Sequence, residues 1–183
     1  AKLPSEPRWL GQVHGIHGLE HPGPAATGAA QPRADAAVAF EPGRVCVVMT
    51  ADCLPVVFAD RAGTRIGVAH AGWRGLVGGV LEATVAALQA EPDQLVAWLG
   101  PAIGPDAFEV GPEVRDAFIA RDAANADAFV RNATGRFQAD LYRLAFGVEW
   151  ANWITPRHTL RIDTTAQRSP LKSLNFAALR IKD

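Results

Sequence analysis

The sequence predicts one domain of the α+β (mixed α/β) class, spanning residues 1–183, and three features lead to this prediction. Apolar residues make up 49% of the chain, which is enough for one sizeable core. Continuous runs rich in β-branched residues occur at 45–49 and 54–59, as in strands that are buried on both faces. A strand, a helix and a second strand then follow between residues 64 and 99, which is the order of a βαβ unit with a right-handed crossover.

The first elements in chain order are a loop and three strands. Residues 22–43 contain four prolines and an Ala/Gly-rich stretch, which interrupt regular structure, so we expect a surface loop there. Strands are expected next at 44–49 and 54–59, and a third at 64–70 after the turn at 60–63. At least one pair of strands in the domain should be parallel.

Helices dominate the next part of the chain. The sequence GWRG at 72–75 opens a helix whose apolar residues recur at helical spacing as far as Leu88. Pro92 marks the end of this helix, and residues 94–99 are expected to form the next strand. Pro112 suits the first position of a further helix with an apolar stripe.

The C-terminal part of the chain shows weaker patterns. One helix is expected at 139–150, and residues 159–162 and 176–181 are candidate strands. Residues 167–173 between these candidate strands show no periodicity. The chain contains no internal repeat.

Composition excludes several classes of function. Eighteen basic and nineteen acidic side chains give a net charge of −1, so no bulk positive field is available for a nucleic-acid polymer. The apolar runs are shorter than the roughly 20 residues that a membrane span requires. Residues 1–7 lack the apolar region of a signal peptide, so we expect a cytoplasmic protein. The two cysteines, Cys46 and Cys53, cannot form a disulfide framework and are packing, metal-binding or catalytic groups.

Three side chains with metal-binding chemistry lie where regular structure is interrupted. His70 ends the third expected strand and is followed by a glycine-flanked turn, where α/β proteins commonly place residues that contact ligands. Cys53 lies in TADCLP at 50–55, where polar residues interrupt an apolar stretch. His14 lies in QVHG at 12–15, just before the long loop.

The spacing of these residues leaves two interpretations open, because they are separated by far more residues than the ligands of structural zinc modules. If they converge, two imidazoles and one thiolate suit zinc with an open fourth position, as in catalytic sites. Otherwise Cys53 is a small buried hydrophobe, and His70 is a core histidine with its hydrogen bonds satisfied.

The turn after His70 supplies candidate substrate-binding residues, which are Gly72, Trp73 and Arg74. Arg74 follows the turn at an expected helix N-terminus, where free backbone N–H groups and a guanidinium suit a phosphate. Pairing with a surface carboxylate is the alternative for Arg74. Trp73 is either a stacking surface for an aromatic ligand or a core residue.

Two carboxylates are candidate catalytic acid/base groups, alongside Cys53 and Arg74 as catalytic residues. Glu109 lies between apolar neighbours, so it is either a buried proton-transfer group or a capping or surface residue. Asp52 directly precedes Cys53. Two further histidines, at 17 and 21, either supplement a metal site or are solvated loop residues.

Four motifs in order resemble the YfiH family, whose members are described as laccase-domain or polyphenol oxidase proteins and as purine nucleoside phosphorylases. The motifs are QVHG at 12–15, TADCLP at 50–55, GVAHAGWRG at 67–75, and LGPAIGP at 99–105 with FEVG at 108–111, all within residues 8–118. The resemblance implies that His14, Cys53 and His70 bind zinc. It also implies a four-layer α/β/β/α fold with mixed sheets, like the catalytic domain of the cytotoxic necrotizing toxins.

The resemblance implies an activity as well. The family's reactions are phosphorolysis of adenosine, inosine and S-methyl-5′-thioadenosine to the base and a pentose 1-phosphate, and deamination of adenosine. Zinc would supply an activated water for deamination, with Glu109 or Asp52 moving the proton. In phosphorolysis, the cation and Arg74 would position the phosphate. The implied partners are therefore a nucleoside and phosphate, and the oligomeric state is left open.

Two parts of the chain depart from the family pattern. Family members have a segment before the first motif, which we expect this chain to lack. Beyond about residue 144 the match weakens, because the family's second Cys-Thr pair and its aromatic-Ser-Tyr-Arg-Arg segment have no counterpart in 158–175. Residues 176–181 resemble only the closing strand. Pocket residues that the family draws from these regions are left unassigned.

Three other functions remain open at this point. Two histidines, a cysteine and a methionine also suit copper, but Met49 would lie about 13 Å from Cys53 along an extended strand at roughly 3.3 Å per residue. Five histidines are also too few for a mononuclear and a trinuclear copper centre together. A cysteine hydrolase or deamidase would use Cys53 as nucleophile and His70 as base. A non-catalytic metal-bound module is the last alternative.

Overall fold

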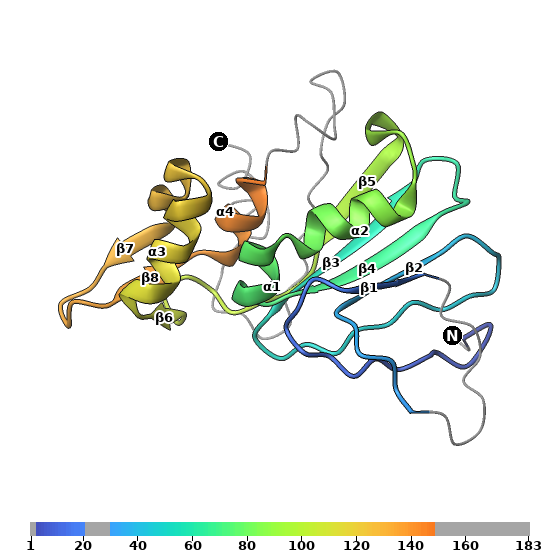
Figure 1. The fold of residues 1–183 in the computed structure, drawn as a ribbon, viewed down its shortest axis with the longest axis horizontal. Coiled ribbons are helices and arrows are strands. Elements are labelled where there is room, and N and C mark those ends of the chain that lie inside the picture. The colour runs from blue at the N-terminus through green and yellow to red at the C-terminus, as the bar shows by residue number, and fades with distance from the viewer. Residues whose placement is uncertain (1–2, 21–29, 149–183) are drawn as a thin grey trace, which may run out of the picture.

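The computed structural model describes residues 3–20 and 30–148, which form two β-sheets with helices beside them (Figure 1). The larger sheet has five strands in the order β1 (Gly18–Glu20), β2 (Ala36–Ala39), β4 (Ile66–Ala71), β3 (Leu54–Asp60) and β5 (Leu95–Leu99). The smaller sheet has three strands in the order β6 (Glu109–Val110), β8 (Phe137–Ala139) and β7 (Phe129–Arg131).

The helices cover these sheets, which confirms the mixed α/β class (Figure 1). Helices α1 (Trp73–Gly78) and α2 (Val80–Leu88) belong to the larger sheet, and α2 packs against β4, β2 and β1. Helix α3 (Pro112–Arg121) lies against the smaller sheet, and α4 (Leu141–Phe146) lies between the two parts. Two 3₁₀ helices, η1 (Pro92–Gln94) and η2 (Ala123–Ala128), complete the described elements.

The strand directions confirm the expected strand–helix–strand order and add one detail to it. Strands β4 and β5 run in the same direction because both are antiparallel to β3, which lies between them. The neighbouring parallel pair in this sheet is β1 with β2. The two strands joined by the helices are therefore parallel but not adjacent, since the earlier strand β3 pairs with both.

The expected loop at 22–43 is wrong over part of its length, because β2 lies within it. All four residues of β2 are buried. Ala36 and Val38 pack in the main core cluster, whereas Ala37 belongs to a second cluster with Leu10 and Val68 on the other face of the sheet. Small alanine side chains fit between these two packed faces.

The expected strand at 44–49 is also wrong, because these residues pair with no strand. Cys46 and Val48 nevertheless pack against the second cluster, beside Leu10. The apolar run at 44–49 therefore correctly predicts that some of its side chains are packed against the core. It does not report backbone pairing, which depends on a neighbouring strand with free hydrogen-bonding groups.

The single helix expected after residue 72 is divided into α1 and α2 at Gly79. This glycine has φ +101°, which lies in the left-handed region, and its N–H donates to the carbonyls of Gly75 and Leu76. A left-handed residue at a helix C-terminus is a common stop, and glycine adopts it without a Cβ clash. The first helix is therefore only six residues long.

Substituting Gly79 tests this break. We expect Gly79→Ala to lower the free energy of unfolding by about 1–2 kcal/mol, because an L side chain is strained at this φ. Urea unfolding followed by circular dichroism measures the change. Gly18→Ala is the control, since its added Cβ makes only an ordinary contact, 3.7 Å from the Cβ of Ala36. Equal stability of the two variants would contradict the assignment of strain to Gly79.

The remaining predictions concern the chain from Pro112 onward, which the structure describes as far as residue 148. Helix α3 confirms the helix expected at Pro112, which occupies its first turn. The helix expected at 139–150 is present as the shorter α4, where the Asp140 carboxylate accepts from the N–H groups of Tyr142 and Arg143. The candidate strands at 159–162 and 176–181 lie outside the described residues, so a single domain over 1–183 stays a prediction.

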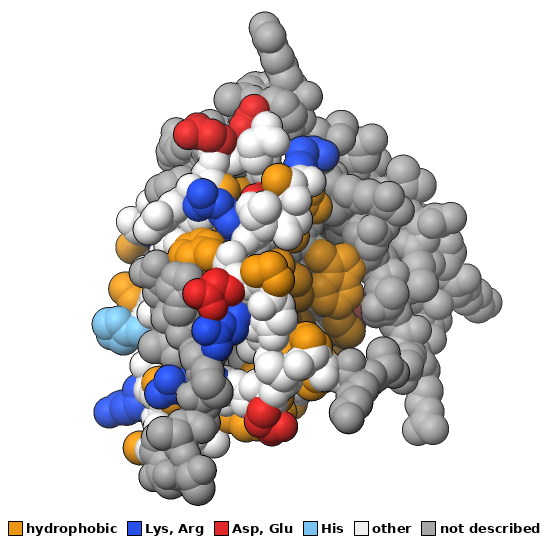
Figure 2. All heavy atoms as spheres, turned by 90° about the vertical axis from the view of Figure 1, so that its right-hand side faces the viewer, with side chains coloured by type: hydrophobic (Ala, Val, Ile, Leu, Met, Phe, Trp, Pro, Cys, Tyr) orange, Lys and Arg blue, Asp and Glu red, His pale blue; other side chains and the backbone are white. Residues whose placement is uncertain are grey.

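One core cluster joins the two sheets. It contains Phe58 and Leu81 from the larger sheet and its helices, together with Phe118 and Phe129 from the smaller part. Figure 2 shows one face of the molecule, on whose described part basic and acidic side chains are interspersed, in line with the net charge of −1. Within residues 3–20 and 30–148, no helix has the length and apolarity needed to cross a bilayer.

Candidate metal centre

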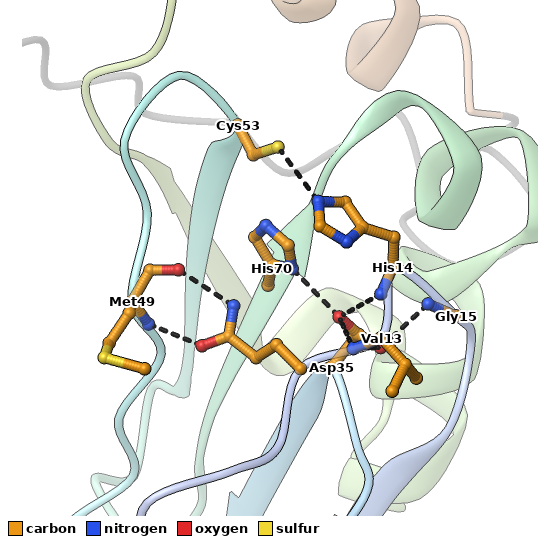
Figure 3. Close-up of polar contacts among 8 residues, drawn as sticks. Val13, His14, Gly15, Asp35, Met49, Cys53 and His70 are labelled. Carbon is orange, nitrogen blue, oxygen red and sulfur yellow. Dashed lines mark hydrogen bonds and ion pairs between the residues drawn. The ribbon is translucent and has the colours of Figure 1, made fainter.

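The structure brings His14, Cys53 and His70 together, with their ligand atoms all within 4.8 Å of one another (Figure 3). They come from three segments: the turn before β1, the residue before β3 and the end of β4. The antiparallel register pairs Pro55 with His70, so Cys53 is placed beside the end of β4. Residues that are far apart in sequence therefore meet at one end of the larger sheet.

The geometry of the three side chains suits a small cation. The Sγ atom of Cys53 lies 3.9 Å from Nε2 of His14, and the two imidazole rings meet edge to face with centroids 4.7 Å apart. His70 is buried, Cys53 is half-buried and His14 is exposed, so the group opens to solvent on one side. Two imidazoles and a thiolate at this spacing fit zinc, with a free side for a further ligand.

Burial raises the pKa of the Cys53 thiol, and the charges of Asp52 and Asp35 raise it further. A thiol with a raised pKa is a poor nucleophile at neutral pH unless a cation compensates the thiolate charge. This electrostatic environment therefore disfavours the cysteine hydrolase alternative, whereas a bound cation would offset the charge of the thiolate. Asp52 itself is exposed.

One residue at the centre of this group is not among the candidates that the sequence provides. Asp35 has no exposed side-chain surface and lies against His70, whose Nδ1 is 2.9 Å from its Oδ1. Burial by itself raises the pKa of Asp35, but hydrogen bonds from His70 and from three backbone N–H groups outweigh it and lower the pKa. An acidic residue between Ala34 and Ala36, directly before an apolar run, is the sequence signal for a buried carboxylate.

A second missed residue, Gln12, ties the segment that leads to Cys53 to the turn that carries His14. Its side-chain N–H donates to the Met49 carbonyl at 2.8 Å, and the Met49 N–H donates to its Oε1 at 2.7 Å. This amide pairs with the backbone as a neighbouring strand would. The Met49 side chain points away from the histidines and Cys53 (Figure 3).

Gly72 lies against the centre. A Cβ atom at this position would be 2.9 Å from Sγ of Cys53 and 2.9 Å from Cδ2 of His14, which is closer than real contacts allow. The turn after β4 must therefore carry a glycine for His14 and Cys53 to approach each other. Trp73 and Arg74 follow directly, and the Arg74 guanidinium lies 4.5 Å from the centroid of the Trp73 ring.

Glu109 lies on the smaller sheet, in β6. Its carboxylate accepts from the side-chain amide of Asn132 at 2.7 Å and forms an ion pair with Arg136 at 3.0 Å. These contacts match the capping or surface interpretation of Glu109. His17 is exposed and outside the three-residue group, and His21 lies outside the described residues.

The fold and this centre define a two-sheet α/β protein with a solvent-open His/Cys/His group. Residues 1–161 match the family model described as "Multi-copper polyphenol oxidoreductase laccase". The chain therefore belongs to this laccase-domain family, which is the family that the YfiH motifs indicate.

Named relatives extend the comparison. The chain is 57% identical over 145 residues to a purine nucleoside phosphorylase of Pseudomonas aeruginosa, covering 79% of this chain and 58% of that protein. It is 55% identical over 143 residues to purine nucleoside phosphorylase YfiH of Escherichia coli K12, covering 78% and 57%. Adenosine deaminase RL5, from an unknown prokaryotic organism, is 39% identical over 142 residues, covering 72% and 54%. The chain thus spans little more than half the length of these relatives.

A solved structure agrees with the fold. A Neisseria meningitidis protein of the DUF152 family superposes with a TM-score of 0.74 at 46% identity, over 80% of this chain and 60% of that one. The two-sheet arrangement is therefore shared with a protein of related sequence.

Proposed function

We propose that the protein is a zinc-dependent purine nucleoside phosphorylase that also deaminates adenosine. The observation that carries this proposal is the convergence of His14, Cys53 and His70 on one solvent-open site, in a chain whose relatives are named for these two reactions. The proposed substrates are adenosine, inosine and S-methyl-5′-thioadenosine, with phosphate as co-substrate. We propose a cytoplasmic location as well.

The chemistry of the three ligands supports zinc as the metal. Neutral imidazole nitrogens and a thiolate are ligands that zinc prefers, and three of them leave one position open. A bound zinc ion supplies Lewis acidity at that position. His14 is exposed and Cys53 is half-buried, so a ligand can reach the group from solvent.

Arg74 binds the phosphate in this proposal. In phosphorolysis a phosphate oxygen forms a bond to C1′ as the bond from C1′ to the base nitrogen breaks, and the base leaves with a proton. Arg74 is exposed beside Gly72, and its stacking on Trp73 holds the guanidinium in place for a two-pronged contact with phosphate. The expected contribution of the helix N-terminus is set aside, because α1 is only six residues long.

Asp52 and Glu109 remain the proposed proton-transfer groups. Asp52 acts on the electrostatics of Cys53 and is exposed, so it can exchange a proton with a substrate near the centre. Glu109 is paired with Arg136 and Asn132 on the smaller sheet. These contacts favour Asp52 over Glu109 for this role.

Copper oxidation of phenols is the second candidate, favoured by the description of the matching family model. Met49 is 55% exposed and its side chain points away from the group, so it would not add a ligand to a copper ion held by His14, Cys53 and His70 (Figure 3). Zinc is therefore the metal that the ligand set supports better.

Elemental analysis combined with a nucleoside assay tests the proposal. Protein purified without added copper should contain about one zinc per chain, release adenine from adenosine only when phosphate is present, and form inosine without it. Stoichiometric copper together with oxidation of phenols would replace the proposal with the oxidase. Metal-free protein that still acts through rapidly alkylated Cys53 would replace it with the hydrolase.

Replacing Arg74 tests its role. We expect Arg74→Ala to raise the KM for phosphate roughly 10- to 100-fold, because a hydrogen bond to a charged group contributes about 1.5–3 kcal/mol. Initial rates at varied phosphate concentration measure this. Arg115→Ala is the matched control, since Arg115 also stacks on an aromatic ring, that of Phe137 at 5.1 Å, on the smaller sheet. An unchanged phosphate KM in Arg74→Ala would remove Arg74 from phosphate binding.

A further inference from the structure

We propose that Asp35 is a positioning residue that prepares both histidine ligands before any metal binds. The inference rests on the proposed metal centre at His14, Cys53 and His70. Asp35 is the fully buried carboxylate that contacts both histidine-bearing segments, the turn at 13–15 and the end of β4. A single side chain thus connects two ligands that are far apart in sequence.

The contact with His70 selects the tautomer of its ring. A carboxylate only accepts hydrogen bonds, so the proton on this side belongs to Nδ1 of His70, which lies 2.9 Å from Oδ1 of Asp35. In the neutral ring the lone pair is then on Nε2, on the opposite side of the ring, where it faces His14 and Cys53 (Figure 3). The backbone N–H of His70 also donates to the Asp35 carbonyl at 2.7 Å, so both the ring and the main chain of His70 are held.

The contact with the turn at 13–15 holds His14. Its backbone has φ +58°, a left-handed conformation that residues other than glycine rarely adopt. The Asp35 carboxylate accepts from the N–H of His14 at 2.9 Å, of Gly15 at 2.7 Å and of Val13 at 3.1 Å. These three bonds stabilise the turn in the conformation that directs the His14 ring toward His70.

Both carboxylate oxygens of Asp35 are engaged by donors. Oδ1 receives the N–H of His14 and Nδ1–H of His70, and Oδ2 receives the N–H groups of Gly15 and Val13. An asparagine at this position must turn an NH₂ group toward one of these two sets. Facing His70, the NH₂ would donate to Nδ1 and move the ring proton to Nε2, which blocks the ligand atom. Facing Gly15, the NH₂ group would point a hydrogen-bond donor at the N–H of Gly15, and the turn at 13–15 would lose this hydrogen bond.

The test begins with the metal-free wild-type full chain and needs no variant. We expect ¹⁵N NMR to show His70 as the Nδ1–H tautomer. We also expect the amides of Val13, His14 and Gly15 to be protected from hydrogen exchange, although Val13 and His14 are exposed. A His70 ring protonated at Nε2, or free exchange of all three amides, would overturn the proposal.

The variant Asp35→Asn then measures the consequence for metal binding. Zinc affinity, determined by competition with a chelator, should fall about 10- to 100-fold, as is typical when a residue that orients a ligand is changed. The Nε2–H tautomer of His70 should increase, or the Gly15 amide should lose its protection. Asp60→Asn is the matched control, because Asp60 also accepts from two backbone N–H groups, at Thr64 and Arg65, but not from a histidine. Wild-type zinc affinity and tautomer in Asp35→Asn would overturn the proposal.

The outcomes separate this inference from the proposed function. If the wild-type chain binds zinc and Asp35→Asn binds it equally well, the inference fails and the zinc enzyme stands. If the wild-type chain binds no zinc, the proposed function fails, and the tautomer and amide exchange in the metal-free protein still decide the role of Asp35. If Asp35→Asn does not fold, the tautomer and amide exchange of the wild-type chain decide whether Asp35 is a positioning residue.

Discussion

Replacing Cys53 with alanine is expected to lower zinc affinity by roughly 100-fold or more and to abolish phosphate-dependent release of adenine from adenosine. Cys53 is the one anionic ligand of the three-residue group. Changing a residue that only orients a ligand lowers metal affinity about 10- to 100-fold, and the loss of Cys53 removes a ligand itself. Chelator competition measures the affinity, and product analysis with and without phosphate measures the activity.

Cys46→Ala is the matched control for this experiment. Cys46 packs against the cluster around Leu10, and burial raises the pKa of its thiol to about 11, so it is an inert packing residue. Its removal should leave zinc content and adenine release unchanged. Tight zinc binding by Cys53→Ala would refute the metal centre. Loss of zinc from Cys53→Ala with full adenine release would show that the reaction needs no metal.

Gly72→Ala is expected to lower zinc affinity by at least about 10-fold without unfolding the protein. Gly72 has φ −67° and ψ +161°, which alanine adopts freely, so no backbone strain results. The added methyl group would instead lie 2.9 Å from both Sγ of Cys53 and Cδ2 of His14. Those two side chains must move apart, and a displacement of about 1 Å is enough to weaken a ligand set of fixed geometry.

Chelator competition and thermal unfolding, measured on the same samples, test this prediction. Gly18→Ala is again the control, because its added methyl group makes only an ordinary contact with Ala36. We expect the two variants to have similar unfolding temperatures and to differ in zinc affinity. If Gly72→Ala bound zinc as tightly as the wild-type chain, the close packing of Gly72 against His14 and Cys53 would not matter for the centre.

Local patterns predicted much of the fold. The strands at 54–59, 64–70 and 94–99 are present as β3, β4 and β5, because continuous apolar runs there are buried in the sheet. Side-chain hydrophobicity reports burial, however, and not hydrogen-bond pairing. The apolar residues 44–49 are packed without being a strand, and the alanine-rich β2 is a strand without looking like one.

For the candidate site as well, the sequence predicts the residue types but not how they are arranged in space. The sequence supplied His14, Cys53 and His70 as residues with metal-binding chemistry, and Gly72 and Arg74 as their neighbours. Their spacing could not show convergence, because the approach of Cys53 to His70 depends on the register of β3 against β4. That register is a property of the assembled sheet.

The sequence by itself therefore determined a two-cysteine, five-histidine α/β chain with a limited choice of metal ligands. Only the tertiary structure decided that three of these residues lie within 4.8 Å of one another and that Asp35 is buried against His70. The reason is physical: residue types set which chemistry is available locally, whereas the distances between ligands depend on strand pairing and packing between distant segments. A buried carboxylate becomes recognisable as functional only when its hydrogen-bond donors are known.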